Sequence, residues 1–182
     1  LGMEGGEGAT SGSVTVKNTA RIATDGTNAR GIVAQSIGGG GGTGGSVEQA
    51  TMAIGGGALT GVLDELNAAK LLGTSVFTTA TGGNGQVVTV NNSVNGNIDT
   101  VGKRAAAIQA QSIGGGGGIG GNASGTVSLG GFGSAAGDGQ DVIINNDGIL
   151  RTFGKNSSAI VAQSIGGGGG DGGASNGGVE SK

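Results

Sequence analysis

A tract of five consecutive glycines occurs three times in this chain, each time after nearly the same apolar lead-in. The copies read GIVAQSIGGGGGTGG at 31–45, AIQAQSIGGGGGIGG at 107–121 and AIVAQSIGGGGGDGG at 159–173. A flexible linker needs glycine or serine but no fixed sequence in front of it. Uniform glycine therefore predicts a place where segments pack backbone to backbone and a Cβ would clash. A flexible loop and a recent duplication remain as alternatives.

The similarity extends upstream of the tracts. Val14–Ile32 aligns with Val142–Ile160 without a gap, and Val88–Ile108 is longer by two residues. Each copy contains V-x-V or V-x-I ending in Asn, an aliphatic-x-Thr ending in Gly, and then the lead-in. Short apolar runs separated by corner residues, with a turn of roughly 20–25 residues, predict a β-solenoid.

The repeat units span about 12–45, 83–121 and 137–173 of one solenoid segment, 1–182, which we expect to belong to a longer polypeptide. Gln111 lies 76 residues after Gln35, and Gln163 lies 52 residues after Gln111. These spacings predict two coils per repeat, with an insertion at about 48–81 in the longer interval. Apolar residues at helical spacing favour a short helix at about 59–72 in this insertion, and an extra coil is the alternative.

Alternation with period two assigns the residues of the third strand to two faces. Ile160, Ala162 and Ser164 are expected inside, and Val161 and Gln163 outside. The side chains expected to hold the coils together are Ile32, Ala34, Gln35, Ile108, Ala110, Gln111, Ile160, Ala162, Gln163, and the corner asparagines Asn18, Asn92 and Asn146. With two coils per repeat, these asparagines would lie roughly 10 Å apart, because neighbouring strands are about 4.8 Å apart.

The composition argues against catalysis. The chain contains 48 glycines and no histidine or cysteine, so it lacks the usual nucleophile–base pairs and zinc sites. The net charge is −3 and the aromatic content is 2%, which argues against nucleic-acid binding. No apolar run approaches the length of about 18 residues that spans a bilayer. We expect no enzyme activity and no bound nucleic acid.

Calcium is the one cofactor for which the sequence offers a candidate. GDGQDVI at 137–143 fits the core of calcium-binding solenoid repeats, with Asp138 and Asp141 as ligands. The equivalent GNGQVVT at 83–89 has Val87 in place of Asp141. A site shared between stacked coils needs both carboxylates, so a plain turn without a cofactor is the favoured interpretation.

The lead-in IVAQSIGGGGG, preceded by V-x-V-x-N and I-x-T-x-G, resembles the repeats of very large autotransporter adhesins of Gram-negative bacteria. The resemblance covers most of the chain outside 48–81, and the helical-looking insertion departs from it. It implies a β-helical passenger exported by type V secretion, followed by a membrane barrel that this segment does not include. It also implies an extracellular location on the outer-membrane surface and a role in adhesion, aggregation or biofilm formation, without catalytic residues.

The sequence thus predicts an all-β fold, a right-handed parallel β-helix, with a structural and adhesive function. The expected partners are a host or neighbouring-cell surface or further copies of the chain, with membrane contact only through the barrel. A calcium-stabilised repeat and a solenoid that binds ice or glycans are the alternatives. Sparse threonines (Thr24, Thr100, Thr152) weigh against ice binding, and the scarcity of aromatics weighs against glycans.

Overall fold

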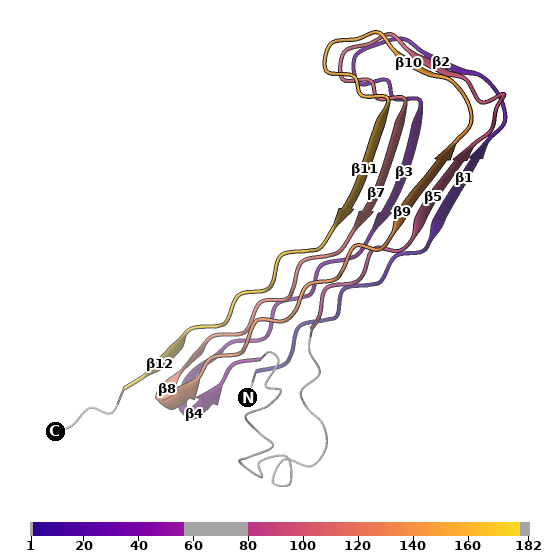
Figure 1. Ribbon diagram of the computed structural model, residues 1–182. Coiled ribbons are helices and arrows are strands. Elements are labelled where there is room, and N and C mark those ends of the chain that lie inside the picture. The colour runs from indigo at the N-terminus through magenta and orange to yellow at the C-terminus, as the bar shows by residue number, and fades with distance from the viewer. Residues whose placement is uncertain (1, 57–79, 179–182) are drawn as a thin grey trace.

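In the computed structural model, which describes residues 2–56 and 80–178, all regular elements are β-strands (Figure 1). They form four three-stranded parallel sheets, which confirms the all-β prediction and is compatible with a solenoid. The sheets are β1 (Val14–Asn18), β5 (Val88–Asn92) and β9 (Val142–Asn146); β2 (Ile22–Thr24), β6 (Ile98–Thr100) and β10 (Leu150–Thr152); β3 (Ile32–Ile37), β7 (Ile108–Ile113) and β11 (Ile160–Ile165); and β4 (Val47–Ile54), β8 (Ala123–Leu129) and β12 (Ser175–Gly177).

The chain visits the four sheets in the same order three times, and we call each traverse a pass. Val88 of the second pass pairs with both Val14 and Val142, so consecutive repeats are direct neighbours. The prediction of two coils per repeat is therefore wrong. The glycine tract and the segment opposite it belong to the same pass as the strands, so one pass uses the whole repeat. For this reason Gln111 and its partner on the next pass, Gln163, are 52 residues apart.

Residues 47–54, most of which the sequence prediction placed in the insertion, form β4 and pair with β8. The predicted helix at 59–72 lies outside the described residues.

Three of the sheets enclose a narrow core at one end of each pass (Figure 1). On β3, Ile32, Ala34 and Ser36 are buried, whereas Val33 and Gln35 face solvent. The same alternation recurs on β7, so period two assigns these side chains to the two faces of the sheet. The buried core consists of Ile32, Ala34, Val88, Val90, Ile98, Ala107, Ile108 and Ala110.

The corner between the second and third sheets uses left-handed backbone. Asn28, Arg104 and Asn156, which occupy equivalent positions in the three passes, have φ of 63°, 54° and 59°. Asparagine tolerates this region because its short amide bonds locally to the backbone. Of the asparagines and glycines that close the first two apolar runs of each copy, only Gly26 has a positive φ among the described residues.

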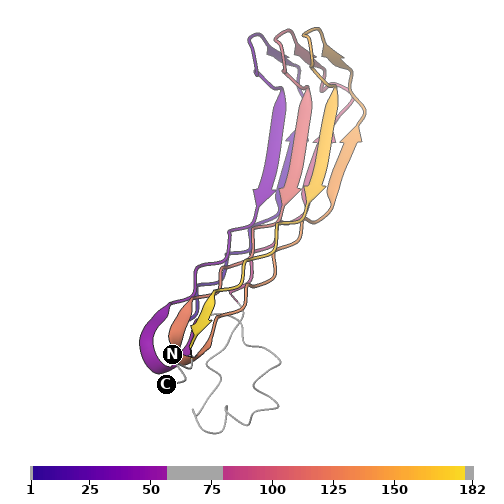
Figure 2. The same ribbon diagram turned by 90° about the vertical axis from the view of Figure 1, so that its left-hand side faces the viewer.

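We call the end of each pass where three sheets enclose the core the triangular end. Beyond it, each pass narrows to two facing segments without strand structure (Figures 1 and 2). We call 38–45, 114–121 and 166–173 the tract segments, because they contain the five glycines. We call 2–12, 80–87 and 130–141 the approach segments, because they lead into β1, β5 and β9. The two sets form two layers that run in opposite directions.

Backbone hydrogen bonds in these layers repeat every three residues. Gly38, Gly41 and Gly44 donate their N–H to the carbonyls of Ile113, Gly116 and Ile119 in the next pass, at 2.7–2.8 Å. The residues that follow, Gly39, Gly42 and Gly45, donate across the layers to the carbonyls of Ala9, Gly6 and Met3, at 2.6–2.8 Å. Three residues per turn is the period of the polyproline II helix, which makes no internal hydrogen bonds and leaves its N–H groups for neighbours.

This period explains the glycine tract. Of each three residues, one faces the next pass, one faces the opposite layer and one faces solvent. A Cβ on Gly41 or Gly42 would clash with backbone atoms, whereas at Gly40 nothing lies closer than 3.8 Å. The next outward position is the one that varies between copies, as Thr43, Ile119 and Asp171. In the middle tract, 114–118, four of the five glycines are thus required by packing, and Gly116 is not. In the third tract only Gly167 and Gly170 would clash, because no further pass packs against it.

We expect Gly117→Ala to lower the free energy of unfolding by about 1–3 kcal/mol, the usual cost of overpacking. The new Cβ would clash with the Ser134 carbonyl oxygen and lie 2.5 Å from the Gly170 amide nitrogen. Gly116→Ala is the matched control, because its Cβ would lie 3.7 Å from the nearest atom. Alanine there should stabilise by about 0.4–1 kcal/mol by restricting the unfolded chain. Urea unfolding followed by circular dichroism measures both, and equal losses would contradict the packing.

A second prediction concerns stacking of the aliphatic residue that opens each lead-in. Ile108 is 0% exposed between two passes, whereas Ile160 on the third pass is 43% exposed. Ile108→Ala should cost about 2–5 kcal/mol of unfolding free energy, as for a fully buried aliphatic. Ile160→Ala should cost less than half of that, because its side chain is packed on one side only. The same urea titration tests this, and equal costs would show that passes do not bury one another.

Candidate functional site

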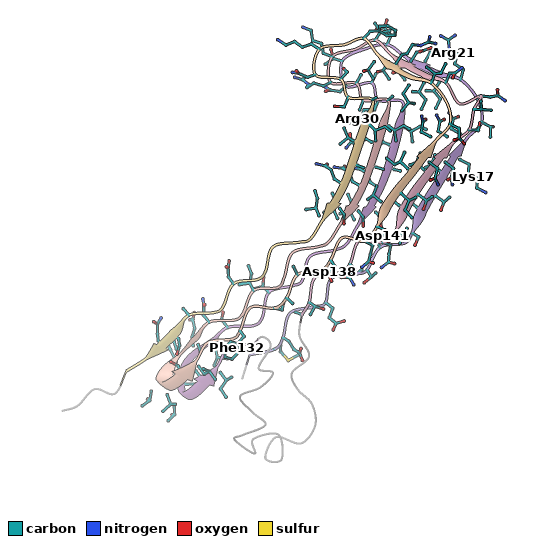
Figure 3. The ribbon with its side chains drawn as sticks, viewed as in Figure 1. Lys17, Arg21, Arg30, Phe132, Asp138 and Asp141 are labelled. Carbon is teal, nitrogen blue, oxygen red and sulfur yellow. The ribbon has the colours of Figure 1, made fainter. Side chains whose placement is uncertain are left out.

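Charged side chains from all three passes meet on the outer face of the β2–β6–β10 sheet. Each strand has three residues, of which the first and third point into the core and the middle one points outward. The outward middle residues are Ala23, Asp99 and Arg151, which are direct register partners. Figure 3 shows Arg21, the residue before β2, at this end of the molecule.

Asp99 lies between two arginines and binds both. Arg21 donates to Asp99 Oδ2 through Nε at 3.1 Å and Nη2 at 2.8 Å, and Arg151 donates to Oδ1 through Nε at 2.7 Å. The arginines cover the carboxylate, so Asp99 is buried although it points outward. Hydrogen bonds from Arg151 and Arg21 hold the pKa of Asp99 below its ordinary value.

An open hollow of about 450 Å³ lies on this face. It exists because Ala23 is small while the residues around it are long. Its floor and walls come from all three passes: Arg21, Ala23, Thr24 and Asp25 from the first, Asp99 and Val101 from the second, and Arg151 and Phe153 from the third. Val101 and Phe153 are 54% and 66% exposed, so apolar surface adjoins the charged groups.

The corner asparagines form a direct ladder. Asn18 Nδ2 donates to Asn92 Oδ1 at 2.8 Å, and Asn92 Nδ2 donates to Asn146 Oδ1 at 2.7 Å. The separation of roughly 10 Å that the sequence analysis expected is wrong, because consecutive repeats are adjacent passes. Asn92 also donates to the Gly96 carbonyl at 2.6 Å and thereby stabilises its corner.

The predicted residues of the lead-in lie on two faces. Ile32, Ala34, Ile108 and Ala110 are buried, whereas Ile160 and Ala162 lie on the open side of the third pass and are exposed. Gln35 donates to Gln111, and Gln111 donates to Gln163, through their side-chain amides on the outer face of the β3–β7–β11 sheet. These residues stack the passes and bring no reactive groups together.

The calcium candidates Asp138 and Asp141 are exposed on the approach segment of the third pass (Figure 3). Asp138 lies beside Asn84, whose side-chain oxygen accepts a hydrogen bond from the Asp138 N–H at 2.8 Å. Within 2–56 and 80–178, no group of three or more His, Cys, Asp or Glu residues is placed to hold a metal ion. The plain turn without a cofactor stays a prediction, with calcium binding as its untested alternative.

The column of threonines points inward. Thr24, Thr100 and Thr152 donate their hydroxyls to the carbonyls of Ala29, Ala105 and Ser157, at 2.6–3.0 Å. These hydroxyls satisfy corner carbonyls and do not form an exposed threonine ladder of the kind that ice binding uses.

Sequence reasoning missed the group of Arg21, Asp99 and Arg151. The signal was available, because aligning the aliphatic-x-Thr elements places Asp99 and Arg151 at the same middle position. The predicted second coil would lie between Asp99 and Arg151, so the two-coil prediction left no contact between them.

Comparison of this chain with family models, with curated proteins and with solved structures finds no match. In the part of the chain that the structure describes, no helix is long and apolar enough to cross a membrane.

The low pKa of Asp99 predicts a loss of stability in acid. A carboxyl with a depressed folded-state pKa stabilises the fold above its ordinary value of 3.8, and this contribution disappears as the pH falls through the folded-state value. Asp99→Asn should therefore lower the thermal midpoint at pH 7, and its difference from the parent chain should shrink below about pH 4. Asp25→Asn, on the same face but outside the ion pairs, is the control. A difference that stays constant from pH 7 to pH 2 would contradict the role of these ion pairs.

Proposed function

We propose that this chain is a segment of a right-handed parallel β-helix that forms a structural and adhesive part of a cell-surface autotransporter passenger. The parallel, in-register strands support the fold, and the resemblance of the repeats to those of large adhesins supports the family. The proposed location is the outer surface of a Gram-negative bacterium. The role is non-catalytic.

The observation that carries this proposal is the repetition of the same side chains in columns through three passes. Ile32, Ile108 and Ile160 form one such column. In this column Ile108, on the middle pass, is fully buried, whereas Ile160, on the third pass, is exposed. A further pass with the same motif would bury Ile160 as Ile108 is buried and would pair the free edge of β11. Such a cross-section supports an elongated scaffold that grows by repetition.

The shape of a pass favours adhesion. Each pass adds only about 4.8 Å along the stack, the spacing of neighbouring strands. Since a pass uses 54 residues between Val88 and Val142, the result is a broad blade with large outer faces. Exposed Val33 and Ile37 flank the glutamine ladder on one of these faces. Weak contacts repeated along such a face add up through avidity.

The proposed partners are a host or neighbouring-cell surface and further copies of the same chain. The chain with 182 residues, coupled to fluorescent beads, tests the proposal by retention on bacterial and epithelial cells. We expect retention several-fold above beads that carry an equal amount of the Gly117→Val variant, in which the larger side chain disrupts the two-layer packing. Sedimentation of the free chain over a range of concentrations tests self-association in parallel.

Retention that depends on the native fold, or concentration-dependent self-association, supports the adhesive role. Equal retention of the two bead types on every cell tested, together with a monomer at all concentrations, would contradict it. Circular dichroism of both proteins shows whether the variant has lost its strand signal.

A further inference from the structure

The hollow on the β2–β6–β10 face has the composition of a site for a small polar ligand with one apolar side. Polar groups converge from Arg21, Asp99 and Arg151, and Phe153 presents a ring that is largely exposed. The only other phenylalanine among the described residues, Phe132, lies near the opposite end of the pass, close to β8 (Figure 3). An exposed aromatic ring beside fixed polar groups is a common arrangement in ligand sites.

The polar groups of the hollow are held in place before any ligand arrives. The ion pairs tie both guanidinium groups to Asp99, and the three residues come from three different passes. Asp99 accepts from Nε and Nη2 of Arg21 and from Nε of Arg151. Each guanidinium has five N–H donors, so both arginines retain donors that no other described residue engages. Pre-organisation of this kind lowers the entropic cost of binding.

The charges of the lining residues select the ligand class. Arg21 and Arg151 are balanced by Asp25 and Asp99, so the hollow carries no net charge. A neutral lining does not attract a polyanion or a cation from solution. Hydroxyl groups, which both donate and accept, fit a lining that offers guanidinium donors and the exposed Asp25 carboxylate. The apolar C–H face of a pyranose ring fits against a phenyl ring.

We infer that this hollow binds a neutral hexose unit of a glycan, with Phe153 against the sugar ring and Arg21 and Arg151 donating to its hydroxyls. The inference names the ligand class of the proposed adhesive surface, and it rests on that proposed function for its biological meaning. A single site of this openness is expected to bind weakly, with Kd on the order of 1 mM. Display of many sites along one surface would multiply the effect.

Saturation-transfer NMR on the chain with 182 residues tests the inference with methyl β-galactoside, methyl α-mannoside, lactose and cellobiose. Sialyllactose and a heparin tetrasaccharide serve as anionic comparisons. We expect transfer to at least one neutral sugar, at least a tenfold loss of affinity in Phe153→Ser, and unchanged binding in the matched Phe132→Ser variant. Both phenylalanines are exposed, so circular dichroism and thermal midpoints should match those of the parent chain.

Binding that is confined to the anionic sugars, or that is equal in the two variants, would overturn the inference. Absence of transfer to any sugar while the beads still adhere would overturn it and leave the adhesive function standing. Sugar binding that depends on Phe153, without adhesion to cells, would support the site and count against the adhesive function.

Discussion

Direct hydrogen bonding between the backbones of glycine residues in the two layers is the interaction on which this structure depends. The Gly83 N–H donates to the Gly39 carbonyl, Gly115 donates to Gly83, and Gly137 donates to Gly115, each at 2.8 Å. This series crosses from one layer to the other and from one pass to the next, so it joins both directions of the assembly. A Cβ at these positions would force the layers apart. The chain can therefore hold a broad cross-section together with only 2% aromatic residues.

The triangular end of each pass is held together by side-chain packing and not by glycine backbone contacts. Ile, Val and Ala fill its core, threonine hydroxyls and asparagine amides satisfy the corner carbonyls, and the outer face is left for other groups. Because the passes stack in register, a side chain repeated in each pass becomes a column. A difference between passes, such as Ala23, Asp99 and Arg151, becomes a local site. The same stacking thus produces both the scaffold and its candidate binding hollow.

Much of the triangular region was predictable from the sequence, whereas only the pairing of Asp99 with Arg151 was predictable in the candidate site. Alternation in the lead-in placed Ile160 and Ala162 on the inner face, and their equivalents Ile108 and Ala110 are buried, whereas Ile160 and Ala162 themselves are exposed because the third pass is packed on one side only. The spacing of glycine by three in the approach segments, at Gly2, Gly5 and Gly8, matches the three-residue period of the hydrogen bonds between the layers. The pairing of Arg21 with Asp99 depends on residues 78 positions apart, and no local pattern specifies it.

By itself, the sequence determined the faces of the strands and the need for glycine in the tracts. Period-two alternation and a missing Cβ act on a residue and its immediate neighbours, so they can be read from short stretches of chain. Only the tertiary structure decided that one repeat makes one pass and that each tract packs against the approach segments. It also decided that Asp99 lies between two arginines. These outcomes depend on how many residues the chain uses before it returns to pair with the previous pass. The entropic cost of closing such a loop varies only slowly with its length. The length of a pass is therefore set by the sum of many weak backbone contacts along it, which no short stretch of sequence specifies.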